Sequence, residues 1–114
     1  NDFVNTTDQA AVHFQIFLTR FYQLFPELLE HDLYIIGESY AGHYIPAFAH
    51  YIVSNSSNDY IKLRGVAIGN GWVDPLRQTA VYSTFCYAAG LISNKERDFI
   101  KAIEVQSLLA LLRG

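Results

Sequence analysis

Apolar residues recur at helical spacing in the first part of the chain. Between Phe14 and Phe25 they fall three and four positions apart, the spacing of a helix that buries one face. Thr6 and Gln9 stand three residues apart just before this stretch, in the pattern of a capping box. Pro26 ends the pattern, because proline disrupts a helix interior. The sequence therefore predicts a helix from Thr6 to the residue before Pro26, with one buried side.

Two short apolar runs, at residues 33–36 and 63–68, have a different pattern. They lack a regular polar face, which is typical of parallel strands covered on both faces. The second run ends at a Gly-Asn-Gly turn. We expect both runs to be strands of one parallel sheet.

Three further stretches have the composition and spacing of helices: residues 41–53, 78–89 and 94–112. The first contains Pro46, which would sit in a first turn or kink the helix. A polar loop at residues 54–59 follows it. The last two helices are separated by residues 90–93, and Ser93 or Asn94 would cap the second of them.

The order helix, strand, helix, strand, helix is that of an α/β protein with a parallel sheet. Sheets have about five or six strands on average, and a parallel sheet needs helices on both faces. Two strands are too few. We found no repeat, linker or low-complexity segment, so we interpret residues 1–114 as the central part of one larger α/β domain with an incomplete sheet.

The composition narrows the function classes. The chain has 114 residues, 51% hydrophobic and 15% aromatic, as in globular proteins. Its net charge is -3 and Lys and Arg do not cluster, so neither nucleic acid nor an anionic membrane is an expected partner. The apolar run at residues 108–112 is far shorter than the roughly 18 residues of a membrane span. The first residues lack signal-peptide features, as would any chain that begins inside a longer protein.

The single cysteine and the two sequons give only weak indications of function. Cys86 is the only cysteine, so it is either a small buried residue or a thiol paired outside the chain. Two sequons, at Asn5 and Asn55, lie in stretches expected to be loops and are candidate glycosylation sites, which favours a secretory route. No group of side chains has ligand spacing, so no metal or cofactor is expected.

The most informative stretch is Gly37-Glu38-Ser39-Tyr40-Ala41, between the first strand and the next helix. A serine on a sharp strand-to-helix turn has the geometry of a nucleophile elbow, in which small flanking residues let strand and helix approach. The usual pattern is G-x-S-x-G, and Ala41 departs from it. The N–H of Tyr40, at the positive end of the helix, would give one donor to an oxyanion hole.

An elbow serine also needs a histidine base and an acid, which in this fold follow it in the chain. The histidines lie before the serine or on the helix directly after it: His13, His31, His43 and His50. None follows the three downstream aspartates, Asp59, Asp74 and Asp98. We therefore expect that the chain cannot complete its own triad.

Several motifs in order resemble the serine carboxypeptidases, an α/β-hydrolase family of the carboxypeptidase Y and cathepsin A type. The matching stretches are GESYAGHYIP at residues 37–46, FYQLFPE at 21–27, LRGVAIGNGWVDP at 63–75 and YAAGLIS at 87–93. Beyond about Lys95 the resemblance fades. It implies that the chain is an internal fragment of an α/β-hydrolase fold.

The resemblance also implies roles for particular residues. Ser39 would be the acylated nucleophile and Tyr40 the donor of half the oxyanion hole. Glu38 would help to hold the C-terminal carboxylate of a peptide substrate, since a carboxyl group that shares a proton with a second one can donate to a carboxylate. Asn70 and Gly71 would mainly shape the floor of the site, with substrate contact as a second interpretation.

By the same resemblance, the family's Asn-Gly-Gly-Pro-Gly segment and its catalytic Asp and His are absent from this chain. The complete protein would be a serine-type carboxypeptidase of the vacuole, lysosome or extracellular space, acting on peptides with a free C-terminus. Two alternatives remain open: a serine carboxypeptidase-like acyltransferase and a truncated product without catalysis. Nothing in the sequence points to an oligomeric state.

Overall fold

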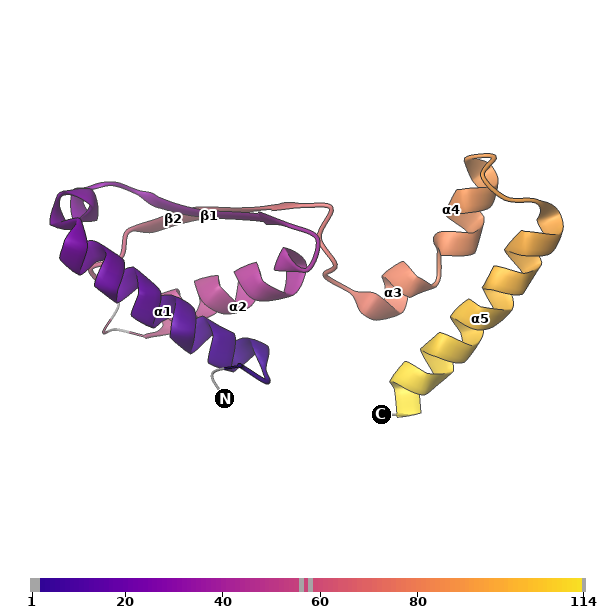
Figure 1. Ribbon diagram of the computed structural model, residues 1–114, viewed down its shortest axis with the longest axis horizontal. Helices are drawn as coiled ribbons and strands as arrows, with labels where there is room; N and C mark the ends of the chain where they lie inside the picture. Colours follow the sequence, from indigo (N-terminus) through magenta and orange to yellow (C-terminus); the bar gives the residue numbers. More distant parts are fainter. Residues whose placement is uncertain (1–2, 56, 58, 114) are drawn as a thin grey trace. The chain divides into compact units, whose positions relative to one another are not determined.

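The computed structural model describes residues 3–55, 57 and 59–113. The chain forms two compact units, Asn1–Val73 and Asp74–Gly114, and each is described by itself. Figure 1 shows the elements of both units. No helix of the described residues is long and apolar enough to cross a membrane.

The first unit alternates helices and strands, which are α1 (Thr7–Leu24), η1 (Pro26–Glu30), β1 (Leu33–Glu38), α2 (Ala41–Ser54) and β2 (Leu63–Gly69). The strands pair in parallel, with Ile35 opposite Val66 and Glu38 opposite Gly69. Both predicted strands are confirmed, and both run one or two residues further than the apolar runs. This parallel pair makes the carboxyl ends of β1 and β2 neighbours.

Helices α1 and α2 lie on the same face of the strand pair (Figure 1). Between them and the sheet is a small core of buried side chains from α1, β1, α2 and the segment before β2: Leu18, Tyr22, Ile35, Ile45, Ile52 and Ile61. Phe14 of α1 stacks on Phe48 of α2 with ring centroids 4.5 Å apart. The predicted buried face of α1 is confirmed in part: Phe14, Leu18 and Phe21 pack at this core, whereas Phe17, Leu24 and Phe25 are exposed within the described residues.

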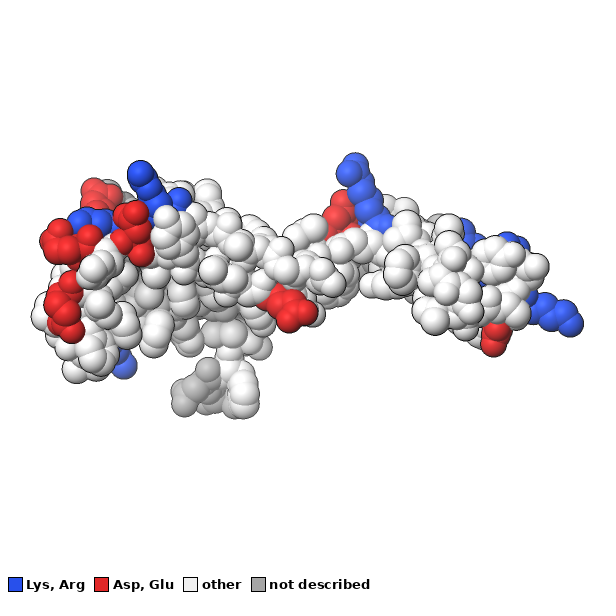
Figure 2. Space-filling view, turned by 90° about the horizontal axis from the view of Figure 1, so that it is seen from above, with Lys and Arg blue, Asp and Glu red and all other residues white. Residues whose placement is uncertain are grey.

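The opposite face of the sheet is open within the described residues. Tyr34 and Ile36 of β1 are 58% and 74% exposed, and Val66 of β2 is 48% exposed. In Figure 2, which views the strands from that side, charged side chains gather mainly at one end of the unit, where Lys62 pairs with Glu30. The sequence predicted strands covered on both faces, and the described residues cover one.

The predicted cap of α1 is confirmed with one difference. The Oγ1 of Thr6 accepts a hydrogen bond from the N–H of Gln9 at 3.2 Å. The Gln9 side chain reaches back one residue further than a capping box requires and accepts from the N–H of Asn5 at 2.8 Å. The helix ends at Leu24, and Pro26 starts the short η1 helix.

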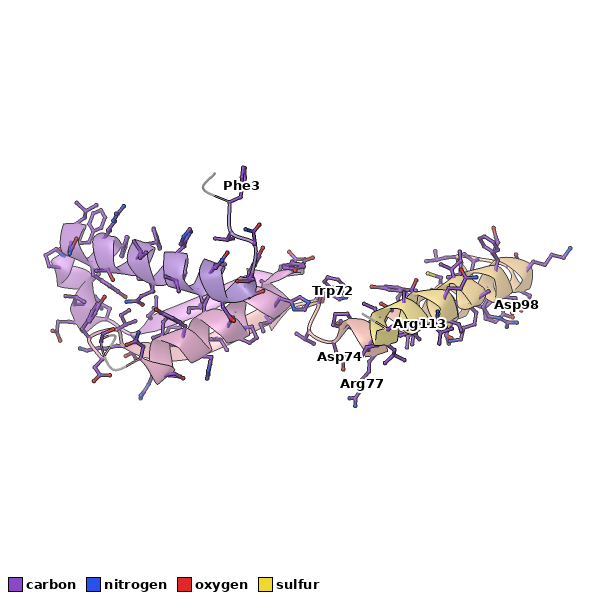
Figure 3. All side chains as sticks on the ribbon, turned by 90° about the horizontal axis from the view of Figure 1, so that it is seen from below. Phe3, Trp72, Asp74, Arg77, Asp98 and Arg113 are labelled. Carbon is purple, nitrogen blue, oxygen red and sulfur yellow. The ribbon has the colours of Figure 1, made fainter. Side chains whose placement is uncertain are left out.

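The second unit contains α3 (Pro75–Thr79), α4 (Tyr82–Ala88) and α5 (Asn94–Arg113). The single helix predicted at residues 78–89 was wrong, because α3 begins earlier and a break separates it from α4. Asp74 caps α3 by accepting from the N–H of Arg77 at 3.1 Å. The Arg77 side chain returns to the same carboxylate at 3.4 Å, and both residues are labelled in Figure 3.

The predicted break at residues 90–93 is confirmed by two adjoining caps. Gly90 has φ +70, and the N–H groups of Gly90 and Leu91 bond to the carbonyls of Tyr87 and Cys86. This is a Schellman motif that ends α4 at a glycine. Ser93 and Glu96 then form a reciprocal capping box for α5, at 2.7 and 3.4 Å.

A buried carboxylate joins α5 to α4. Glu104 is 3% exposed and accepts from the N–H of Ser83 at 2.6 Å and from its Oγ at 2.9 Å. Lys101 contributes a charged contact at 3.2 Å. The Ser83 N–H is in the first turn of α4, where backbone donors have no intrahelical acceptor. Glu104 thus caps α4 from another helix.

Candidate active site: a serine on a strand-to-helix bend

Ser39 lies on the bend between β1 and α2, as the sequence predicted, and its backbone is in a rarely occupied conformation. Its φ is 58, in the left-handed region that a residue with a Cβ seldom adopts. Such strain persists only where the surroundings fix the backbone. The N–H of Ser39 bonds to the carbonyl of Gly69 at 3.1 Å, and its carbonyl accepts from Gly42 at 3.0 Å and Trp72 at 2.8 Å.

The flanking small residues have a direct steric reason. A Cβ added at Gly37 would lie 2.7 Å from the Cβ of Ala41, so residue 37 has to be glycine while residue 41 carries a methyl group. Ala41 itself is the first residue of α2 and needs no positive φ. This explains how alanine replaces the last glycine of the usual pattern: one of the two positions must lack a Cβ.

A second pair of glycines brings the turn after β2 against the first turn of α2. A Cβ at Gly42 would lie 2.7 Å from the backbone of Trp72. A Cβ at Gly71 would collide with Ile68 and approach the Cα of Gly42 to 3.4 Å. This close approach is what lets the N–H of Trp72 reach the carbonyl of Ser39.

The turn itself contains Asn70, which has φ 41. Asparagine tolerates this conformation better than most residues. Together with the packing of Gly71, this supports a turn-shaping role for both residues. Their contact with substrate stays a prediction.

Backbone donors are available beside the serine. Tyr40 precedes the first residue of α2 and has helical φ and ψ of -62 and -13. Its N–H points along the start of a helix, where donors lack intrahelical acceptors and the helix dipole favours negative charge. Within the described residues neither this N–H nor the Oγ of Ser39 has a hydrogen-bond partner. Both groups are therefore available to a substrate.

Glu38 is the last residue of β1, and it is exposed directly beside Ser39. It takes part in no ion pair among the described residues. The structure thus brings Glu38, Ser39 and Tyr40 together at the carboxyl end of β1, with the turn at Asn70 and Gly71 at the neighbouring end of β2.

No histidine of the described residues is bonded to Ser39. His43 packs its ring against Tyr40 and Trp72, and the Nδ1 of His50 lies 3.3 Å from the Oγ of Ser54 at the far end of α2. That the chain cannot complete its own triad stays a prediction.

The two candidate glycosylation sites, Asn5 and Asn55, have the following surroundings. Asn5 lines a hollow of about 240 Å³ together with the Tyr40 and Tyr44 side chains. The Oδ1 of Asn55 accepts from the N–H and Oγ of Ser57 at 3.1 and 2.7 Å, and Ser56 of the same sequon lies outside the described residues.

Cys86 and the acidic and histidine side chains show no further site. Cys86 is a free, half-buried thiol in α4. Among the residues that the structure describes, no group of three or more His, Cys, Asp or Glu side chains could hold a metal ion.

The backbone contact of Trp72 with Ser39 was not predicted from the sequence. The Trp72 N–H bonds to a residue 33 positions earlier, and no local pattern predicts such a contact. The available signal was Gly42 and the last glycine of the Gly-Asn-Gly turn, Gly71, since paired glycines mark a close approach of two backbones.

Comparisons with known proteins agree with the local geometry. Residues 1–110 match the protein family described as serine carboxypeptidase. The chain is 42% identical over 97 residues to the probable serine carboxypeptidase CPVL of Dictyostelium discoideum, and 46% identical over 96 residues to the pheromone-processing carboxypeptidase KEX1 of Ogataea parapolymorpha. These matches cover 82% and 84% of this chain but only 19% and 16% of the relatives, so the chain spans less than a fifth of their length.

A solved structure shows the same fold. The crystal structure of Kex1(delta)p, a prohormone-processing carboxypeptidase from Saccharomyces cerevisiae, is similar with a TM-score of 0.77 and 28% sequence identity. The match covers 96% of this chain and 29% of that one. The α/β fold and the resemblance predicted from the sequence are both confirmed, with a sheet that is incomplete in this chain.

Proposed function

The chain belongs to the serine carboxypeptidase family, and from that premise we propose that the complete protein releases C-terminal residues from peptides with Ser39 as the nucleophile. The observation that carries this proposal is the strained bend at Ser39, with φ 58 between a parallel strand and a helix. An exposed serine Oγ at such a bend is presented to a substrate carbonyl. Attack there forms an acyl-enzyme, which water then hydrolyses.

The backbone N–H of Tyr40 stabilises the oxyanion that forms during this attack. Support comes from its position at the start of α2 and from its lack of an acceptor within the described residues. A donor already aimed at the developing charge needs no reorganisation in the transition state. The second donor and the base come from parts of the protein outside this chain.

Glu38 binds the free carboxylate at the end of the peptide. It stands beside Ser39 at the end of β1, exposed and outside every ion pair of the described residues. A carboxyl group can donate to another carboxylate only while protonated, and a second carboxyl group nearby would favour that state. Carboxypeptidase activity should then be highest in acid and fall as the shared proton is lost.

The 114-residue chain alone is inactive in this proposal, because no histidine of the described residues is hydrogen-bonded to Ser39 and one face of the sheet is open. The two sequons and the family support a secretory location, in the vacuole, the lysosome or outside the cell.

The test is C-terminal residue release from a blocked dipeptide by the complete protein and its Ser39→Ala variant. We expect release by the wild type and a loss of at least about a thousandfold in Ser39→Ala. The wild type should act much more slowly on a substrate amidated at its C-terminus than on the same substrate with a free carboxylate. The ratio of these two rates should be smaller in Glu38→Gln. Equal activity of wild type and Ser39→Ala would overturn the proposal. Transfer of the acyl group to an added alcohol in place of water would instead identify an acyltransferase.

A further inference from the structure

The His43 ring lies against two aromatic side chains beside the nucleophile bend. It is in the first turn of α2, 4.9 Å from the Tyr40 ring and 5.2 Å from the Trp72 ring, the latter edge-on at 80°. Edge-on contacts between rings at such distances are attractive and hold the rings at a defined angle. His43 thus fixes the side chain of Trp72 from the helix side.

The position of Trp72 matters for Ser39. Its N–H donates the shortest of the three backbone hydrogen bonds that hold Ser39, at 2.8 Å to the Ser39 carbonyl. Ser39 occupies the left-handed region at φ 58 and keeps that conformation only as long as its partners stay in place. A shift of Trp72 would therefore move the nucleophile.

The polar atoms of His43 do not account for its position. Its Nε2 is buried and has no hydrogen-bond partner within the described residues. A buried polar atom without a partner costs free energy, so such a group needs an explanation. Here the ring contacts supply one, since the His43 ring packs against both Tyr40 and Trp72, whose own rings lie 5.6 Å apart.

We propose that His43 is a positioning residue of the nucleophile bend, acting through Trp72 by the shape of its ring and not by proton transfer. The proposal rests on the proposed function, because it assigns Ser39 as the group being positioned. It predicts that phenylalanine can replace His43 with little loss in the reactivity of Ser39, although phenylalanine can neither bind nor release a proton.

The test is labelling of the complete protein by a fluorophosphonate probe, with the rate at saturating probe measured separately from the half-saturating concentration. We expect His43→Ala to lower the saturated rate about tenfold, because a small misplacement of a reacting atom is costly, and to leave half-saturation nearly unchanged. His43→Phe should stay within about twofold of wild type. His50→Ala, on the same helix but at its far end, is the matched control and should label as wild type does.

Each other outcome decides against the proposal. An unslowed His43→Ala would show that the ring does not position the nucleophile, and a His43→Phe as slow as His43→Ala would assign the effect to the imidazole nitrogens. If His43→Ala does not fold, His43→Leu replaces it, and an unslowed His43→Leu overturns the proposal. If the wild type labels no faster than Ser39→Ala, the proposed function and this inference are overturned together. If only Ser39→Ala loses labelling and His43→Ala labels as the wild type does, this inference is overturned and the proposed function stands.

Discussion

The nucleophile bend and the Glu104 cap use opposite means to hold a helix start. At the bend, α2 begins without any side-chain cap, and the backbone of Ser39 is strained. At the start of α4, the buried carboxylate of Glu104 satisfies both the N–H and the Oγ of Ser83. The first arrangement leaves the N–H of Tyr40 without an acceptor within the described residues, and the second gives the N–H of Ser83 a charged acceptor. An unsatisfied donor beside a strained backbone is typical of a site that acts on a substrate, and a satisfied buried donor is typical of a structural contact.

The largest effect is expected from filling the contact between Gly42 and Trp72. In a helix, Gly42→Ala should by itself add about 1 kcal/mol of stability. The new Cβ would lie 2.7 Å from the Trp72 backbone, however, and that backbone cannot move without moving Ser39. We expect Gly42→Ala to lower the free energy of unfolding by about 3 kcal/mol and fluorophosphonate labelling by about a hundredfold. Chemical denaturation and labelling rates check both values.

A stabilised Gly42→Ala variant with unchanged labelling would contradict this account of the bend. It would mean that the close approach of the two backbones is incidental to the site.

The second prediction tests the Glu104 cap by the same measurements. Glu104→Gln keeps the shape of the side chain but removes its charge, and its amide NH₂ would face a donor of Ser83 or Lys101. We expect a loss of about 2 kcal/mol in the free energy of unfolding, because a buried hydrogen bond to a charged group is replaced by a mismatched pair. Its matched control is Glu96→Gln, the same change at an exposed position of the same helix, with a loss below about 1 kcal/mol.

Equal losses for Glu104→Gln and Glu96→Gln would remove the distinction between a buried cap and a surface one. Labelling should fall less for Glu104→Gln than for Gly42→Ala, since Glu104 belongs to the unit without the serine.

The third prediction concerns pH. Burial raises the pKa of the Glu104 carboxyl, but the hydrogen bonds from Ser83 and the contact with Lys101 outweigh it, so that its pKa lies below the ordinary value. A depressed pKa gives stability that is fully present above the ordinary carboxyl pKa and is lost as the pH falls through the folded-state pKa. The difference in unfolding free energy between wild type and Glu104→Gln should therefore persist at neutral pH and shrink in strong acid. Denaturation curves of both proteins across that pH range test this prediction. A difference in unfolding free energy that grows in acid would contradict a lowered pKa of Glu104.

The smallest effect is expected at the end of α4. Gly90 has φ +70 with no atom within 4 Å of an added Cβ, so Gly90→Ala adds strain without a clash. We expect a loss of about 1 kcal/mol. Gly90→Asn should lose less, because asparagine tolerates positive φ better. A loss in Gly90→Ala as large as in Gly42→Ala would contradict this ranking, because Gly42 has no positive φ and its expected loss comes from the contact with Trp72.

The sequence predicted local features well and distant contacts poorly. The cap of α1, both strands and the serine bend follow from residues within a few positions of one another, such as Thr6 with Gln9 and Gly37 with Ala41. The break between α3 and α4 was missed because α4 is capped by Glu104, 21 residues after Ser83. The backbone hydrogen bond from Trp72 to Ser39 was missed for the same reason. It depends on the pairing of β1 with β2, which no short motif predicts.

The most direct test of the central claim is fluorophosphonate labelling of the complete protein, followed by identification of the modified peptide. We predict one adduct, on the peptide that contains Ser39, and its loss in Ser39→Ala, while the 114-residue chain alone remains unlabelled because its base is missing. An adduct on another serine, or no adduct on a folded complete protein, would contradict the assignment of Ser39 as the nucleophile.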